Sequence, residues 1–115
     1  MKLLTTFFLA AFFAFSSFAQ SSSPTWNKFL SDLQKAQVEY NKHYPAKEYQ
    51  QAATVLNTVA TSLDNLKLTE KEKQEFQPTI KDVYANVYYN LACLQSLLNE
   101  KKQAIASFEK AIDWG

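Results

Sequence analysis

Few residues in this chain of 115 could do chemistry. It has 12 basic residues, all lysine, and one each of histidine (His43), cysteine (Cys93) and glycine (Gly115). Phosphate-binding loops, dinucleotide-binding motifs and nucleophile elbows need glycines inside a turn, which this sequence does not provide. A structural zinc site needs several Cys or His ligands, and a disulfide needs a second cysteine within the chain. We therefore expect no cofactor and no metal.

The two reactive side chains have no sequence context that indicates catalysis. A general base such as His43 needs a nucleophile and an orienting carboxylate within reach, and no motif supplies them. We therefore expect His43 to be a surface or capping residue, and the chain to have no catalytic residues and no enzymatic activity of its own. Cys93 lies among apolar residues, which predicts a buried, inert thiol. The alternative is a thiol that pairs between chains.

The N-terminus has the pattern of a secretory signal peptide. Met1-Lys2 precedes an uncharged stretch that contains six of the nine phenylalanines, and small residues stand at Ser17 and Ala19. This pattern predicts cleavage after Ala19, so that residues 1–19 are a signal peptide. A membrane anchor is the alternative, but the apolar stretch is shorter than the roughly 20 residues that a spanning helix needs. We expect an exported protein, periplasmic or secreted, without a stable membrane anchor after cleavage.

The predicted mature part, residues 20–115, is one small domain with equal numbers of lysines and acidic residues. Nucleic acids and anionic membrane surfaces attract proteins with a surplus of positive charge. The charge balance therefore predicts no nucleic-acid partner.

Apolar residues recur at helical spacing in four stretches. Ser23-Pro24 predicts the start of a helix over 24–42, Pro45 the start of a second that ends near 65, and a fourth spans about 101–113. Thr69 and Glu72 form a capping-box pattern that begins the third. Pro78 predicts a kink or a short separate turn before the main part, 78–98. No stretch alternates with strand period, so we expect an all-α fold of two stacked antiparallel helical hairpins.

The last helix pair, 85–115, resembles a tetratricopeptide repeat, a helical hairpin of about 34 residues. Asn99 stands at the turn where the repeat usually has glycine, and asparagine tolerates the left-handed conformation. The plain helical hairpin is the alternative. The first two helices do not fit the same register, which indicates a degenerate hairpin. The matches to the repeat pattern are Tyr88, Leu91, Ala92, Ala104, Phe108 and Ala111.

The resemblance implies an interaction module. Such repeats bind peptides in a groove lined by their first helices, and no cation stands at the groove positions here, so binding of a free peptide C-terminus is not expected. The alternative is that Tyr89 and Leu97 pack against the second helix or against a missing neighbour. The groove positions are Asn86, Tyr89, Asn90, Cys93, Ser96 and Leu97.

We expect the partner to be a protein, a peptide, or a neighbouring domain or repeat. A second hypothesis is that the chain is the N-terminal helical appendage of a longer secreted hydrolase or peptidase, with its catalytic domain beyond residue 115. Further helix pairs after Gly115 would favour the first hypothesis, and a catalytic motif there would favour the second.

Overall fold

The computed structural model describes residues 21–115 and shows an all-α fold, as the sequence predicts. Four helices follow one another: α2 (Pro24–His43), α3 (Tyr49–Asp64), α4 (Glu70–Leu97) and α5 (Lys101–Trp114). No strand occurs in this part of the chain. The predicted signal peptide, residues 1–19, lies outside the described residues.

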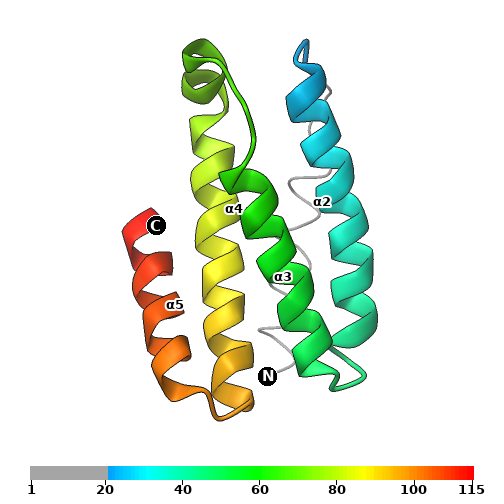
Figure 1. Ribbon diagram of the computed structural model, residues 1–115, viewed down its shortest axis with the longest axis vertical. Coiled ribbons are helices and arrows are strands. Elements are labelled where there is room, and N and C mark those ends of the chain that lie inside the picture. Colours follow the sequence, from blue (N-terminus) through cyan, green and yellow to red (C-terminus); the bar gives the residue numbers. More distant parts are fainter. Residues whose placement is uncertain (1–20) are drawn as a thin grey trace.

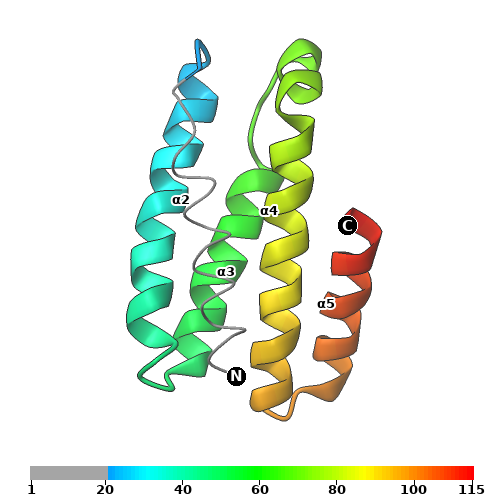
Figure 2. The same ribbon diagram turned by 180° about the vertical axis from the view of Figure 1, so that it is seen from behind.

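Successive helices are antiparallel neighbours, which confirms the two predicted hairpins. The long helix α4 packs against α3 on one side and against α5 on the other, while α2 packs on α3 (Figure 1). The view from behind in Figure 2 shows α5 beyond α4, away from α2 and α3. Among the described helices, α5 therefore has α4 as its one neighbour.

The N-terminal ends of α2 and α4 are joined by aromatic side chains. Ser23 caps α2, because its hydroxyl accepts a hydrogen bond from the backbone N–H of Trp26 at 3.2 Å. The indole of Trp26 stacks on the ring of Phe76 from α4, with centroids 4.4 Å apart and planes inclined by 5°. Both side chains belong to the buried core. This stack connects two helices that are far apart in the sequence.

The turn between α2 and α3 differs from the sequence prediction. Pro45 does not open the second helix; it lies in a turn over 44–47, and α3 begins only at Tyr49. Lys47 has a φ of 61°, and the Glu48 N–H donates back to the carbonyl of His43 at 3.0 Å. A left-handed residue followed by such a backward hydrogen bond ends a helix. The segment 44–47 therefore ends α2, whereas Pro45 in this segment predicted the start of the next helix.

Helix α4 begins as predicted but does not break at Pro78. The Thr69 hydroxyl accepts from the Glu72 N–H at 3.1 Å, and the Glu72 carboxylate accepts from the Thr69 N–H at 2.9 Å. The helix then continues through Pro78, so the prediction of a short separate turn is wrong. Phe76 and Ile80 are both buried on either side of the proline. Their packing holds the backbone helical at a position where local preference opposes it.

Helix α5 is where packing departs most from the sequence prediction. Asn99 takes the expected left-handed conformation, with φ of 60°. The apolar side of α5, however, is not in the core: Ile105, Phe108 and Ile112 are 46% to 62% exposed, whereas Ala111 is buried. The physical reason is that α5 rests on a single neighbour. Periodicity identified its apolar face, but no second helix covers that face within the described chain.

The capping box of α4 gives a first testable prediction. Replacing Thr69 with alanine removes the acceptor for the Glu72 N–H, and the loss of an N-cap costs about 1 kcal/mol. For a domain of this size the midpoint of thermal unfolding should fall by about 4–8 °C, measured by circular dichroism. Thr58→Ala is the matched control, because its exposed hydroxyl bonds only to the carbonyl of Thr54 within α3. Equal effects of the two substitutions would contradict the prediction.

Candidate functional site

An apolar groove lies between α4 and α5 and is open to solvent. Its volume is about 470 Å³. One wall is the C-terminal third of α4, and the other is the middle of α5. The lining side chains are Tyr89, Ala92, Cys93, Ser96, Leu97, Ala104, Ile105 and Phe108. None of them carries a formal charge at neutral pH, so the groove suits an apolar surface.

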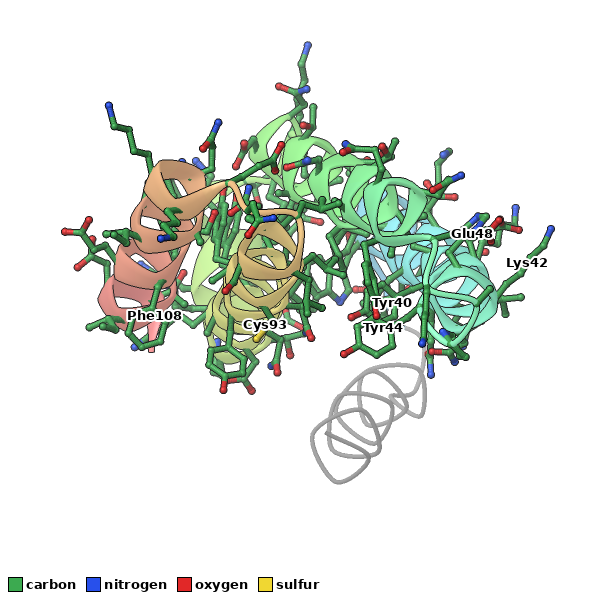
Figure 3. All side chains as sticks on the ribbon, turned by 90° about the horizontal axis from the view of Figure 1, so that it is seen from below. Tyr40, Lys42, Tyr44, Glu48, Cys93 and Phe108 are labelled. Carbon is green, nitrogen blue, oxygen red and sulfur yellow. The ribbon has the colours of Figure 1, made fainter. Side chains whose placement is uncertain are left out.

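The two walls meet through aromatic rings. Tyr89 of α4 and Phe108 of α5 lie with centroids 6.2 Å apart and planes inclined by 47°. Figure 3, which looks along the helices, shows Cys93 and Phe108 on the same side of the molecule. Aromatic and aliphatic side chains on two adjoining helices thus form one continuous strip.

Exposure sets the groove apart from the core. Leu97, Ile105 and Phe108 are large apolar side chains that are exposed to solvent, and all three line the groove. Single exposed apolar residues are ordinary, but a contiguous exposed patch commonly marks an interaction site.

The structure brings four of the six predicted groove residues together and separates the other two. Tyr89, Cys93, Ser96 and Leu97 line the groove, whereas Asn86 and Asn90 do not. The partner wall is also different from the expectation, because α5 forms it rather than another first helix. The sequence prediction missed the contributions of Ala104, Ile105 and Phe108. Their exposure depends on which helices cover α5, and periodicity carries no signal for that.

Asn90 is a core residue. Its side chain is 1% exposed, its Nδ2 donates to the carbonyl of Asn86 at 2.8 Å, and its Oδ1 accepts from the hydroxyl of Tyr40 at 3.4 Å. Burial raises the pKa of the Tyr40 hydroxyl, which keeps it a neutral donor. Asn90 therefore joins α2 to α4 and is not available to a ligand.

Cys93 is a free thiol on the groove wall, only half-buried. The prediction of a buried thiol is therefore wrong. Burial raises the pKa of the Cys93 thiol, so the nucleophilic thiolate is scarce at neutral pH. As the one cysteine of the chain, it is a specific chemical reporter of whether the groove is covered.

His43 lies at the end of α2 between two carboxylates. Its Nε2 is 3.5 Å from an oxygen of Glu39, and its Nδ1 is 2.9 Å from an oxygen of Glu48. Within residues 21–115 no three His, Cys, Asp or Glu side chains gather closely enough to hold a metal ion.

A second, more polar groove of about 650 Å³ lies between α2 and α3. Hydroxyl and amide side chains such as Thr58, Thr61 and Asn57 line much of it. Its two charged residues, Lys28 and Asp32, pair with each other at 2.9 Å on α2. Their charges thus neutralise each other, and the groove offers no fixed net charge to a ligand.

Comparison with models of known protein families, with curated proteins and with solved structures finds no match in any of the three. The resemblance to a tetratricopeptide repeat therefore stays a sequence-based expectation. None of the helices in residues 21–115 is both long and apolar enough to cross a membrane.

Proposed function

We propose that this chain is an exported, tetratricopeptide-like helical module that mediates protein–protein interaction and has no catalysis of its own. The observation that carries the proposal is the exposed apolar groove between α4 and α5, which Leu97, Ile105 and Phe108 line. The repeat-like pattern over 85–115 agrees with it, since all the lining residues of the groove lie in that segment.

The lining of the groove favours one class of ligand. A groove between two helices with apolar and aromatic walls accommodates the apolar face of an amphipathic helix. The anchors of such a ligand are apolar side chains at helical spacing. No cationic side chain lines it, so a peptide carboxylate finds no ion pair there. Tyr89 and Phe108 supply rigid contact area, which is typical of residues that dominate binding energy.

Binding can be measured with a displayed library of amphipathic helical peptides. Selected peptides should bind the purified protein, and Phe108→Asp should weaken the dissociation constant by about tenfold or more, because an aromatic anchor at the centre of an interface is worth well over 1 kcal/mol. Bound peptide should also slow alkylation of Cys93 by iodoacetamide, measured at alkaline pH because burial raises the pKa of this thiol and the thiolate is the reactive form.

The matched control is Val38→Asp, which places the same charge at a large apolar residue that is 66% exposed on α2, outside the groove. It should leave peptide affinity unchanged. A library without helical binders, or binders that tolerate Phe108→Asp and leave Cys93 alkylation unaffected, would overturn the proposal. N-terminal sequencing of the exported protein tests the export part, since retention of residues 1–19 would refute cleavage.

A further inference from the structure

Helix α5 exposes a stripe of apolar side chains that adjoins the groove and is not fully covered by α4. Ile105, Phe108 and Ile112 recur at helical spacing and are all exposed. The adjoining side of α5 packs on α4: Ala111 is buried, Trp114 stacks on Tyr84 with centroids 4.3 Å apart, and Lys110 lies 5.1 Å above the ring of Tyr88. We call Ile105, Phe108 and Ile112 the α5 stripe.

The charges of α5 oppose the dipole of the helix. Lys101 and Lys102 occupy its first turn and Asp113 its last, so that it has no acidic residue at the start and no basic residue at the end. Two of the other helices carry charges that favour the dipole: α4 has Glu70 and Glu72 in its first turn, and α2 has Lys42 and His43 in its last. Helix α3 does not, because it ends on Asp64 without a basic residue in its last turn. The arrangement in α5 is locally unfavourable, by some tenths of a kcal/mol for each charge.

An antiparallel partner helix with the same sequence would reverse this disadvantage. Its acidic C-terminal end would lie beside Lys101 and Lys102, and its basic N-terminal end beside Asp113. Glu100, the N-cap of α5, makes no side-chain hydrogen bond to the first turn. The first-turn N–H groups are therefore not capped by the side chain of Glu100.

The helical positions of the charges fit a two-fold antiparallel pair. With 3.6 residues per turn, Lys102, Glu109 and Asp113 all fall on one flank of the α5 stripe. A two-fold axis perpendicular to two antiparallel helices brings that flank opposite the same flank of the partner. Phe108 then lies near the axis, Ile105 packs between Phe108 and Ile112 of the other copy, and Lys102 of each copy faces Asp113 of the other.

We propose that the partner of the α5 stripe is a second copy of this chain, packed as an antiparallel α5–α5 pair. The inference rests on the proposed function, because Ile105 and Phe108 belong to both the stripe and the groove. One helix of 14 residues presents less than the roughly 800 Å² per partner of a standard interface, so the dimer is weak and reversible.

Sedimentation equilibrium of the wild-type protein from low micromolar to about 1 mM tests the proposal, without any added peptide. The expected result is a monomer–dimer equilibrium. Phe108→Asp should weaken dimerisation by more than about tenfold. Lys102→Glu or Asp113→Lys should each weaken it by about fivefold, because each change turns two symmetry-related attractions into repulsions.

The double variant K102E/D113K is the decisive experiment. It restores both pairs between copies with their signs exchanged, so dimerisation should return to within about twofold of the wild-type value. Within one chain the two residues are about 16 Å apart along α5, beyond the Debye length of about 8 Å at physiological salt. Rescue therefore cannot come from a contact inside one chain.

Two control variants match the changes in charge and apolarity. Lys35→Glu on α2 changes the net charge as Lys102→Glu does, at a residue exposed in the same way. Val38→Asp is the control for Phe108→Asp, because it places the same charge at an exposed apolar residue of α2. Both should dimerise like the wild type. Circular dichroism of every variant should show the wild-type helix content, since the substituted side chains are exposed.

Three results would overturn the inference: a monomer throughout the concentration range, a dimer that tolerates Phe108→Asp, or a K102E/D113K variant no better than its single parents. A strictly monomeric chain that still binds helical peptides in the groove would refute the α5–α5 pair and leave the proposed function intact. A chain that dimerises as predicted but binds no helical peptide would restrict the groove to self-association.

Discussion

Replacing Trp26 with alanine is expected to lower the free energy of unfolding by about 3–5 kcal/mol, the usual cost of truncating a buried aromatic side chain. Trp26 is 3% exposed and stacks on Phe76 at a centroid distance of 4.4 Å. Its ring also contacts Phe29 on the same helix, at 5.3 Å. Its removal leaves a cavity where the N-terminal ends of α2 and α4 meet.

The loss of unfolding free energy is large because the helices lie side by side in a thin layer. Four helices pack side by side, and α2 is in close backbone contact with α3 but not with α4. Side chains such as Trp26 therefore carry the contact between α2 and α4. Small domains have a total stability of about 5–15 kcal/mol, so the variant should lose a large part of it.

Urea unfolding followed by circular dichroism measures this change. Val38→Ala is the control, because Val38 is 66% exposed on the same helix, and its truncation should cost less than about 0.5 kcal/mol. Trp26→Phe should retain part of the stacking and fall between the two. A loss below about 1 kcal/mol for Trp26→Ala would show that α2 and α4 are not held together as described.

Replacing Asn90 with aspartate is expected to cost about 2–5 kcal/mol at neutral pH, although the two side chains have almost the same shape. The Nδ2 of Asn90 donates to the carbonyl of Asn86 at 2.8 Å. The change replaces this donor with an oxygen, which repels the carbonyl oxygen. It also places a carboxylate at a position that is 1% exposed.

The penalty should depend on pH in a defined direction. Burial raises the folded-state pKa of a carboxyl group above its unfolded value of about 3.9. Below that unfolded value the group is protonated in both states, and the ionisation penalty vanishes. As pH rises toward the folded-state pKa, the unfolded state loses its proton first and the variant becomes progressively less stable than the wild type.

The measurement is the difference in unfolding free energy between variant and wild type, taken by urea unfolding at several pH values. Asn57→Asp on α3 is the control, because Asn57 is exposed and its change should cost less than about 0.5 kcal/mol at any pH. A variant at Asn90 with the same small, pH-independent cost would contradict the burial of that residue.

The difference between variant and wild type removes the effects of pH on groups that both proteins share. Hydrogen bonds from the Ser23 hydroxyl and the Thr69 N–H lower the pKa of Glu72. A lowered pKa contributes stability that is lost as pH falls through the folded-state value. Both the wild type and the Asn90 variant carry this contribution, so it cancels between them.

The sequence predicts which α4 residues share a face, but not which of them are exposed in the candidate groove. The repeat-like spacing grouped Tyr89, Cys93, Ser96 and Leu97 on one face of α4. All four line the groove, although α5 forms its other wall in place of another first helix. The same spacing placed Asn90 with them, and the structure instead buries it against Tyr40 of α2. Whether a polar residue at the edge of a face meets solvent or a neighbouring helix depends on distant segments of the chain.

The sequence by itself determined the helices and the signals that begin and end them. Ser23, Thr69 and Glu72 cap helices through bonds to residues within three positions, and Asn99 adopts a left-handed turn that its own side chain tolerates. These interactions are local, so a short stretch of sequence contains all the participants.

Only the tertiary structure decided that α4 continues through Pro78 and which apolar faces stay exposed. Packing of Phe76 and Ile80 carries α4 through Pro78, and the lack of a second neighbour leaves Ile105, Phe108 and Ile112 of α5 uncovered among the described residues. The physical reason is that burial depends on contacts between residues distant in sequence. The amphipathic pattern of α5 specifies an apolar face, whereas the arrangement of helices decides whether that face becomes core or binding surface.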